Sequence, residues 1–126
     1  MKAAYDTSVL PPAPFLPVWL ASLAEDSESI SVQAKLDTGA DLTAIPITLI
    51  DRLHLVPAGE IEVEGFDGRH TTIQAYDINL QVDQLKIVGL LVIGLVEDYA
   101  LLGRDVLNRL RLLLDGPSLI TEILTI

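Results

Sequence analysis

The stretch Ile30–Asp41 reads Ile-Ser-Val-Gln-Ala-Lys-Leu-Asp-Thr-Gly-Ala-Asp, and it decides the fold class. Its first seven residues alternate between apolar and polar, which is typical of a strand with one buried face. The alternation ends at the carboxylate of Asp37, although acidic side chains are normally excluded from such a setting unless they have partners. Gly39 then permits a tight backbone turn beside the acid. The pattern therefore predicts a strand that ends at one acid, which is either a functional carboxylate or an ordinary loop aspartate before a turn.

Short extended segments account for most of the remaining chain. We expect strands at residues 15–23, 42–45, 60–64, 71–82, 85–96, 99–102, 112–114 and 119–126. Two short helical stretches are predicted, one from Pro46 to about Leu53 and one at 104–110. The first 14 residues carry three prolines and are predicted to form an extended arm. Many short strands with few helices indicate an all-β, barrel-like single domain over residues 1–126.

Composition excludes several classes of function. The chain has no cysteine, so it offers no disulfide, no thiolate metal site and no thiol nucleophile. A net charge of −10 disfavours binding to nucleic acid and to anionic membranes. The longest apolar run, Ile87–Val96, is shorter than the roughly 20 residues of a membrane span, and no targeting segment is visible. These features lead us to expect a cytoplasmic protein.

Three blocks of the sequence carry a resemblance to a known family. Leu36–Asp41 resembles the active-site loop of the retropepsins, the retroviral-type aspartic proteases. Leu101–Asp105 resembles their signature before the C-terminal helix, and between the two lie a flap-like hairpin at 64–69 and the stretch Ala75–Asp77. The resemblance runs from about residue 15 to residue 114. It implies a retropepsin-like closed β-barrel with one short C-terminal helix, of the stand-alone bacterial type.

The resemblance also implies roles for the residues of the two signature blocks. Asp37 would be the catalytic aspartate, Thr38 would hydrogen-bond across a two-fold axis, and Gly39 would present its carbonyl to the substrate. Asp41 would contact the substrate backbone, and Ala40 would also bind substrate. In support of this loop, Arg104 would pair with Asp41, Gly103 would lie beneath the loop, and Asp105 would begin the helix.

Substrate contacts are implied for a second set of residues. A mobile flap would have its tip at Gly65, Phe66, Asp67 and Gly68, a more polar tip than the apolar flaps of retroviral enzymes. Ala44, Tyr99 and Leu101 match pocket-wall positions. Lys35 shares a strand face with Asp37 and would favour an acidic or polar substrate side chain, unless it is simply solvated.

One chain supplies one such aspartate, so the predicted site needs two chains. Asp6-Thr7-Ser8 is similar in sequence but lies in the arm with no apolar strand before it. A two-fold symmetric homodimer would bring two copies of Asp37 together. Two carboxylates about 3 Å apart hold one proton between them and can activate water without a metal or another cofactor. The arm at residues 1–14, interlaced with residues 119–126, is the expected interface.

Two other functions stay open at this point. The polar flap leaves room for a catalytically silent module that binds peptides, and the arm at residues 1–14 could close the cleft of an autoinhibited protease. His54 and His70 have no cysteine or second histidine at ligand spacing, so we expect neither to bind a metal. The leading prediction is a homodimeric aspartic endopeptidase acting on peptides or proteins.

Overall fold

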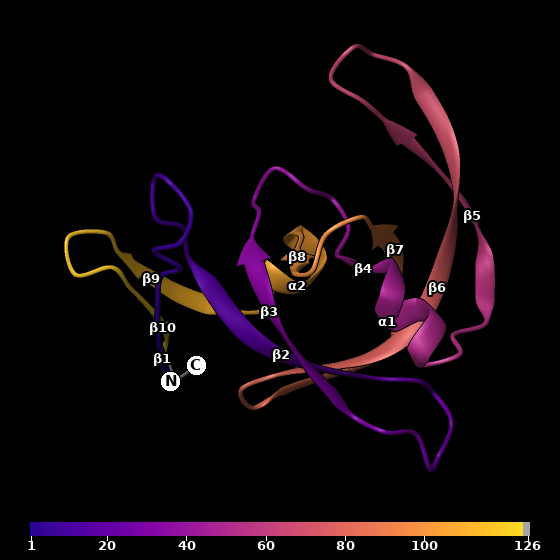
Figure 1. Ribbon diagram of the computed structural model, residues 1–126, viewed down its shortest axis with the longest axis horizontal. Helices are drawn as coiled ribbons and strands as arrows, with labels where there is room; N and C mark the ends of the chain where they lie inside the picture. Colours follow the sequence, from indigo (N-terminus) through magenta and orange to yellow (C-terminus); the bar gives the residue numbers. More distant parts are fainter. Residues whose placement is uncertain (125–126) are drawn as a thin grey trace.

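The computed structural model describes residues 1–124, and β-strands form most of them (Figure 1). The strands are β1 (Lys2–Ala4), β2 (Phe15–Ala21), β3 (Ile30–Leu36), β4 (Ala44–Pro46), β5 (Pro57–Glu64), β6 (His70–Val82), β7 (Leu85–Leu95), β8 (Ala100–Leu102), β9 (Arg111–Asp115) and β10 (Ile120–Leu124). Two short helices complete the described chain, α1 (Ile47–Arg52) and α2 (Arg104–Leu107). No helix in residues 1–124 has the length and apolar character needed to cross a membrane.

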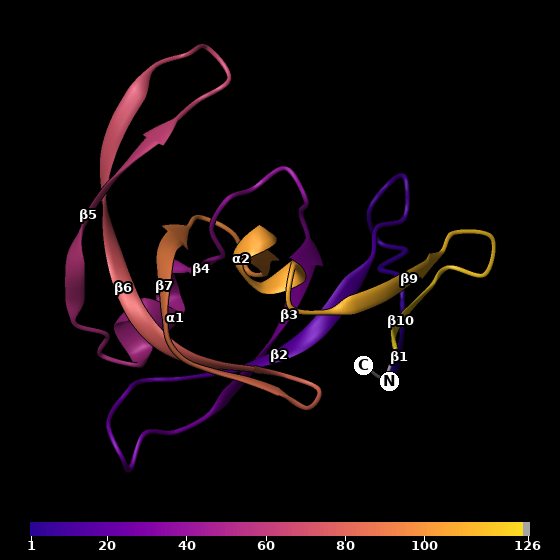
Figure 2. The ribbon, with the colours of Figure 1, turned by 180° about the vertical axis from the view of Figure 1, so that it is seen from behind.

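Six strands close into a barrel in the order β2, β3, β8, β4, β7, β6. The barrel closes because β2 pairs along one edge with β3 and, through Trp19–Ala21, along the other edge with β6. Strand β5 adds to β6 outside the barrel and forms a long hairpin that rises above the body (Figures 1 and 2). The predicted all-β closed barrel is therefore confirmed.

The core is built from the alternating faces of these strands. In β2, Leu16, Val18 and Leu20 are fully buried, and in β3, Ile30 and Ala34 are buried while Ser31 and Gln33 are exposed. Strands β6, β7 and β8 contribute further buried apolar residues, and α2 contributes two. The buried residues of β3 thus lie at the positions that the alternating sequence predicted.

A second, smaller sheet contains both ends of the described chain. Its order is β1, β10, β9, and all pairs are antiparallel. The sequence predicted that the arm would interlace with residues 119–126, and β1 does pair with β10 within the chain. The role of these strands at a dimer interface stays a prediction. Residues 6–13 are not a plain extended arm, because Asp6 and Ala13 form an isolated antiparallel bridge that closes a loop. Of the predicted terminal strand, residues 125–126 lie outside the described residues.

Helix α2 is shorter than the predicted stretch of 104–110. It ends at Leu107, and Arg109 and Leu110 bond in tighter turns, Arg109 N–H to Val106 O and Leu110 N–H to Leu107 O. The chain then enters β9 at Arg111. Strand β9 pairs with β10 from Arg111 onward, so no helical turn extends past Leu110.

Candidate active site

Asp37 lies at the end of a strand that is fixed in the barrel. Strand β3 pairs in parallel with β8, with Leu36 opposite Leu102. The Asp37 N–H donates to Leu102 O at 3.0 Å, so the pairing extends to the acid itself. The chain then turns, and the Ala40 N–H donates back to Asp37 O at 3.2 Å. The barrel therefore determines the position of this aspartate.

The carboxylate of Asp37 folds over its own turn. Its Oδ1 accepts a hydrogen bond from the Gly39 N–H at 3.0 Å. A Cβ on residue 39 would lie only 3.2 Å from the same oxygen, so glycine leaves room for this contact. Asp37 is half-buried, while Thr38 and Gly39 are exposed. The loop thus presents an accessible carboxylate with one oxygen held by a backbone donor.

Gly103 allows α2 to approach the loop from beneath. A Cβ at this position would meet the carbonyl carbon of Leu42 at 2.6 Å and the oxygen of Ala40 at 3.0 Å. The next residue, Arg104, donates its N–H to Ala40 O at 2.9 Å. The structure therefore places Gly103 and the start of α2 directly against the loop, where the resemblance expected them.

A polar contact between Thr43 and Asp105 joins the loop to α2. The Thr43 N–H donates to Asp105 Oδ2 at 3.0 Å, and its hydroxyl donates to Oδ1 at 2.8 Å. The Gly103 N–H in turn donates to Thr43 Oγ1 at 3.2 Å. Thr43 is fully buried, and the sequence analysis missed it. Asp105 thus does more than begin the helix, because its carboxylate also holds the strand that leaves the loop.

Arg104 holds the outer side of the loop. Its guanidinium donates to Thr38 O at 2.8 Å through Nη1 and to the Asp41 carboxylate through Nη2, the pair that the resemblance implied. Both side chains are substantially exposed. Exposed ion pairs contribute little to stability, so this contact orients the loop more than it stabilises the fold.

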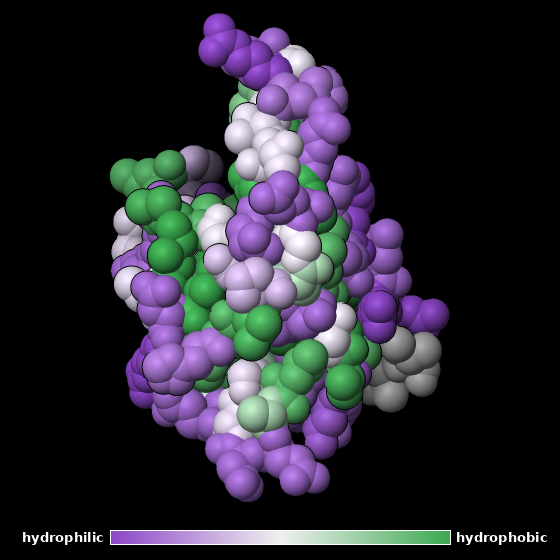
Figure 3. Space-filling view, turned by 90° about the vertical axis from the view of Figure 1, so that its right-hand side faces the viewer, coloured by the Kyte–Doolittle hydropathy of each residue, from purple (hydrophilic) through white to green (hydrophobic). Residues whose placement is uncertain are grey.

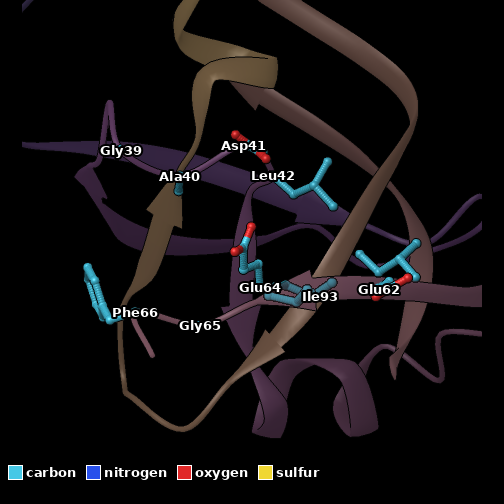
Figure 4. Close-up of a pocket in the computed structure, with 11 residues that line it drawn as sticks. Gly39, Ala40, Asp41, Leu42, Glu62, Glu64, Gly65, Phe66 and Ile93 are labelled. Carbon is cyan, nitrogen blue, oxygen red and sulfur yellow. The ribbon is translucent and has the colours of Figure 1, made fainter. Parts of the chain in front are cut away.

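A cavity of about 460 Å³ separates the loop from the β5–β6 hairpin (Figure 4). The loop lines it with Gly39, Ala40, Asp41 and Leu42; the hairpin lines it with residues 61–66; and Ile93 of β7 lines its base. In Figure 4 the carboxylate of Glu64 points from the hairpin toward the segment that carries Asp41 and Leu42. No residue of the arm at 1–14 lines this cavity.

The end of the hairpin is polar and held only by local contacts. The Gly65 N–H donates to Arg69 O at 2.9 Å, and Asp67 Oδ1 accepts from the Arg69 N–H at 3.0 Å. Gly68 adopts a φ of 77°, which glycine tolerates best. Phe66 is fully exposed. Figure 3 shows hydrophilic residues at the end of this hairpin, above a body with hydrophobic patches.

Four of the residues expected to form substrate pockets do not line this cavity. Ala44 is buried in β4, and Leu101 lies opposite it in β8. Tyr99 packs edge-on against Phe15 with ring centroids 5.6 Å apart. Lys35 is half-buried in β3, between Phe15 of β2 and Leu101 of β8. The pocket roles of these residues stay predictions.

Asp6 has a structural setting of its own. Its Oδ1 accepts hydrogen bonds from the Ser8 hydroxyl at 2.6 Å and from the Ser8 N–H at 2.8 Å. These two bonds, the hydroxyl first, lower the pKa of Asp6 below its ordinary value. In residues 1–124 no group of three or more histidine, cysteine, aspartate or glutamate side chains could hold a metal ion.

The family model and the solved structures that match this chain both describe aspartic proteases. Residues 28–109 match the family model described as "gag-polyprotein putative aspartyl protease". No curated protein matches the chain. A retropepsin-like aspartic protease from Rickettsia conorii is similar in structure, with a TM-score of 0.61 and 17% identity over 96% of this chain and 88% of that one.

Two viral structures are also similar in fold. EIAV protease, complexed with the inhibitor HBY-793, matches with a TM-score of 0.54 and 21% identity over 79% of this chain and 89% of that one. The foamy viral protease–reverse transcriptase matches with a TM-score of 0.59 and 21% identity over 80% of this chain. This chain spans only 12% of that larger protein.

Proposed function

We propose, from the premise that this chain belongs to the retropepsin-like family of gag-polyprotein aspartyl proteases, that two copies of it form an aspartic endopeptidase. The observation that carries the proposal is the setting of Asp37. Its carboxylate is half-buried, anchored by the β3–β8 pairing and held by the Gly39 N–H, and the residues that follow it, 39–42, line a cavity of about 460 Å³. One chain supplies only one such group, so the site needs a second copy.

The reaction needs two carboxylates that share one proton. Two such groups a few ångströms apart cannot both ionise, so the pair carries a single negative charge at working pH. The ionised Asp37 takes a proton from a water molecule, whose oxygen attacks the scissile carbonyl carbon. The protonated partner donates its proton to the leaving amide nitrogen, and the C–N bond breaks. The apparent pKa values belong to the pair rather than to either residue.

The other loop residues would position the reactants. In this proposal Thr38 bonds across the two-fold axis, while the Gly39 carbonyl, Ala40 and Asp41 bind the substrate backbone. Support comes from the bonds of Arg104 to Thr38 O and to Asp41, which order both residues before substrate binds. A preorganised loop avoids the entropic cost of ordering during the reaction.

The β5–β6 hairpin would act as a flap over the bound peptide. Support comes from its position across the cavity from the loop and from the local nature of the contacts at its tip, Gly65–Gly68. Lids of this kind close over substrate on the microsecond to millisecond timescale. Lys35, Ala44, Tyr99 and Leu101 would form subsites only once substrate and partner are in place. The lack of cysteine fits action in the cytoplasm.

The test is cleavage of a peptide library by the wild type and by Asp37→Asn. The assay runs from mildly acidic to neutral pH at high protein concentration, because a weak dimer would be inactive when dilute. Loss of cleavage in Asp37→Asn, with its dimer intact, is the expected result. Persistent cleavage in that variant would show that another group is catalytic. A wild-type dimer that binds peptides without cutting them would instead support a silent binding module.

A further inference from the structure

The cavity between the Asp37 loop and the β5–β6 hairpin is lined by acidic side chains without basic ones. Asp41 lines it from the loop, and Glu62 and Glu64 line it from β5. Among the described residues that line this cavity, none is lysine or arginine. The whole chain has a net charge of −10, so no excess of positive charge elsewhere offsets this field. A substrate can use only those carboxylates that the chain itself leaves unpaired.

Two of the three carboxylates already have a neighbour that can carry positive charge. Asp41 accepts a hydrogen bond from the guanidinium of Arg104. The Oε1 atom of Glu62 lies 2.7 Å from the Nδ1 atom of His70. A cationic ligand would have to displace these neighbours before it could pair with either carboxylate.

Glu64 is the third carboxylate, and it has no such neighbour. Among residues 1–124 it takes part in no ion pair. Its cross-strand partner in β6 is His70, whose Nδ1 approaches Glu62 instead. The nearby guanidinium of Arg69 lies 3.3 Å from the carboxylate of Asp67. The positive groups of the hairpin are therefore directed at other acids, and the charge of Glu64 stays uncompensated.

The position of Glu64 suits a long cationic side chain. Its carboxylate points across the cavity, toward the segment that carries Asp41 and Leu42 (Figure 4). The apolar side chains of Leu42 and Ile93 line the same cavity. Lysine and arginine carry their charge at the end of an apolar stem, which packs on apolar surface while the head reaches a polar group. The cavity offers both surfaces to one such side chain.

We propose that Glu64 is a specificity residue that binds a lysine or arginine side chain of the peptide substrate. The inference rests on the proposed function, because it assumes a peptide held between the loop and the hairpin. A two-fold dimer has two copies of Glu64, so the preference is expected on both sides of the scissile bond. This subsite is separate from the one expected around Lys35, which does not line the cavity.

The test compares peptides that differ at one position at a time, where each carries lysine, glutamine or glutamate. At low ionic strength and one fixed pH, the wild type should show a kcat/KM roughly fivefold higher for lysine than for glutamine at the responsive positions, the size of an exposed ion pair. Glu64→Gln should abolish this ratio. Glu64→Lys should reverse the preference, so that the glutamate peptide becomes the better substrate.

Glu60→Gln is the matched control. Glu60 lies on the same strand and the same face as Glu64 and is exposed, but it does not line the cavity. The two residues are roughly 14 Å apart along the strand, which exceeds the screening length of roughly 8 Å at physiological salt. Glu60→Gln removes one negative charge and should keep the lysine preference. An equal loss of preference in both variants would assign it to net charge and overturn the inference.

Binding to Asp37→Asn separates the subsite from the chemistry. Fluorescence anisotropy of labelled lysine and glutamine peptides reads the preference without cleavage, and adding Glu64→Gln on this background should remove it. Tighter binding of the lysine peptide by a protein whose wild type cuts nothing would uphold the inference and count against the protease function alone. Cleavage or binding with no lysine preference, or with one that Glu64→Gln leaves unchanged, would overturn the inference while the protease stands. A chain that neither binds nor cuts any peptide would overturn both.

Discussion

Two regions line opposite sides of the same cavity, and they are held in different ways. The Asp37 loop is fixed by contacts to distant parts of the chain, such as the Thr43–Asp105 pair, whose members are 62 residues apart. The end of the β5–β6 hairpin makes only local contacts, such as the Asp67–Arg69 ion pair and the approach of His70 Nδ1 to Glu62 Oε1 at 2.7 Å. The Asp37 loop is therefore held in one geometry, whereas the end of the hairpin can move at low energetic cost.

The two regions also differ in burial, and the Asp37 loop is the one supported by buried residues. Thr43 and Gly103 are buried beneath the loop, whereas residues 64–72 are all exposed. Motion of the loop would break buried polar contacts, which is costly because the groups left behind lack water. Motion of the hairpin end exposes almost no additional surface to water, because its residues are already exposed. Substitutions in the two regions should therefore affect different properties of the protein.

The largest effect is expected at Gly103, where the loop and α2 are in closest contact. Gly103→Ala would place a Cβ 2.6 Å from the Leu42 carbonyl carbon, and backbone on both sides prevents relief. We expect a loss of about 3 kcal/mol in the free energy of unfolding. Thermal unfolding would measure it as a fall in Tm of roughly 10 °C. Gly116→Ala is the matched control, because nothing lies within 4 Å of its Cβ position.

An intermediate effect is expected from Thr43→Val. Valine keeps the shape of threonine but removes the hydroxyl, which leaves Asp105 Oδ1 and the Gly103 N–H each with one hydrogen bond fewer. The free energy of unfolding should fall by about 1–3 kcal/mol. Urea denaturation at neutral pH checks the value. A Thr43→Ser variant should be less affected, and equal losses in the two variants would argue against the hydroxyl as the cause.

A smaller and more local effect is expected at Gly68 in the hairpin. Gly68→Ala forces a residue with a Cβ to adopt a φ of 77°, which costs about 1–2 kcal/mol. Because the hairpin end can open without unfolding the barrel, the strain should appear as faster amide hydrogen exchange in β5 rather than as a large fall in Tm. An exchange rate raised equally in β3 would show that the two regions are coupled.

The smallest effect on stability is expected from Phe66→Ala. The ring is fully exposed, so the free energy of unfolding should change by less than about 0.5 kcal/mol. If the hairpin closes over a peptide, the same change should raise the KM for cleavage while leaving Tm unaltered. Steady-state kinetics on one peptide substrate separates the two quantities. An unaltered KM would show that this ring does not contact the peptide.

Sequence patterns predicted the parts of the molecule that depend on local order. The alternation from Ile30 to Leu36 gave the position of β3 and the end of the strand at Asp37, and the structure has both. Arg104 was correctly paired with Asp41 because the family resemblance supplied the long-range contact. Local pattern and resemblance together were sufficient for the barrel and for the position of the loop.

The parts that were missed depend on contacts between distant residues. Nothing near Thr43 in the sequence indicates that Asp105 accepts its hydrogen bonds. Residues 1–14 were expected to be a plain extended arm, and only the three-dimensional path of the chain shows that Asp6 and Ala13 bridge to close a loop between β1 and β2. The regular helix α2 was expected to reach residue 110, but it ends at Leu107 and only tighter turns continue to Leu110.

The 13 residues of β6 make it the longest strand of the described chain, about 40 Å from end to end. Its C-terminal half is clamped on both sides, by β7 and by β2, while its N-terminal half is joined to β5 alone. Strand β6 is therefore fixed in the barrel at one end and free of the barrel at the other. The clamp begins at Ala75, opposite Ile93, whose N–H bonds Thr43 O at 3.2 Å. A slight tilt of β6 at this fixed point therefore becomes a wide displacement at the free tip.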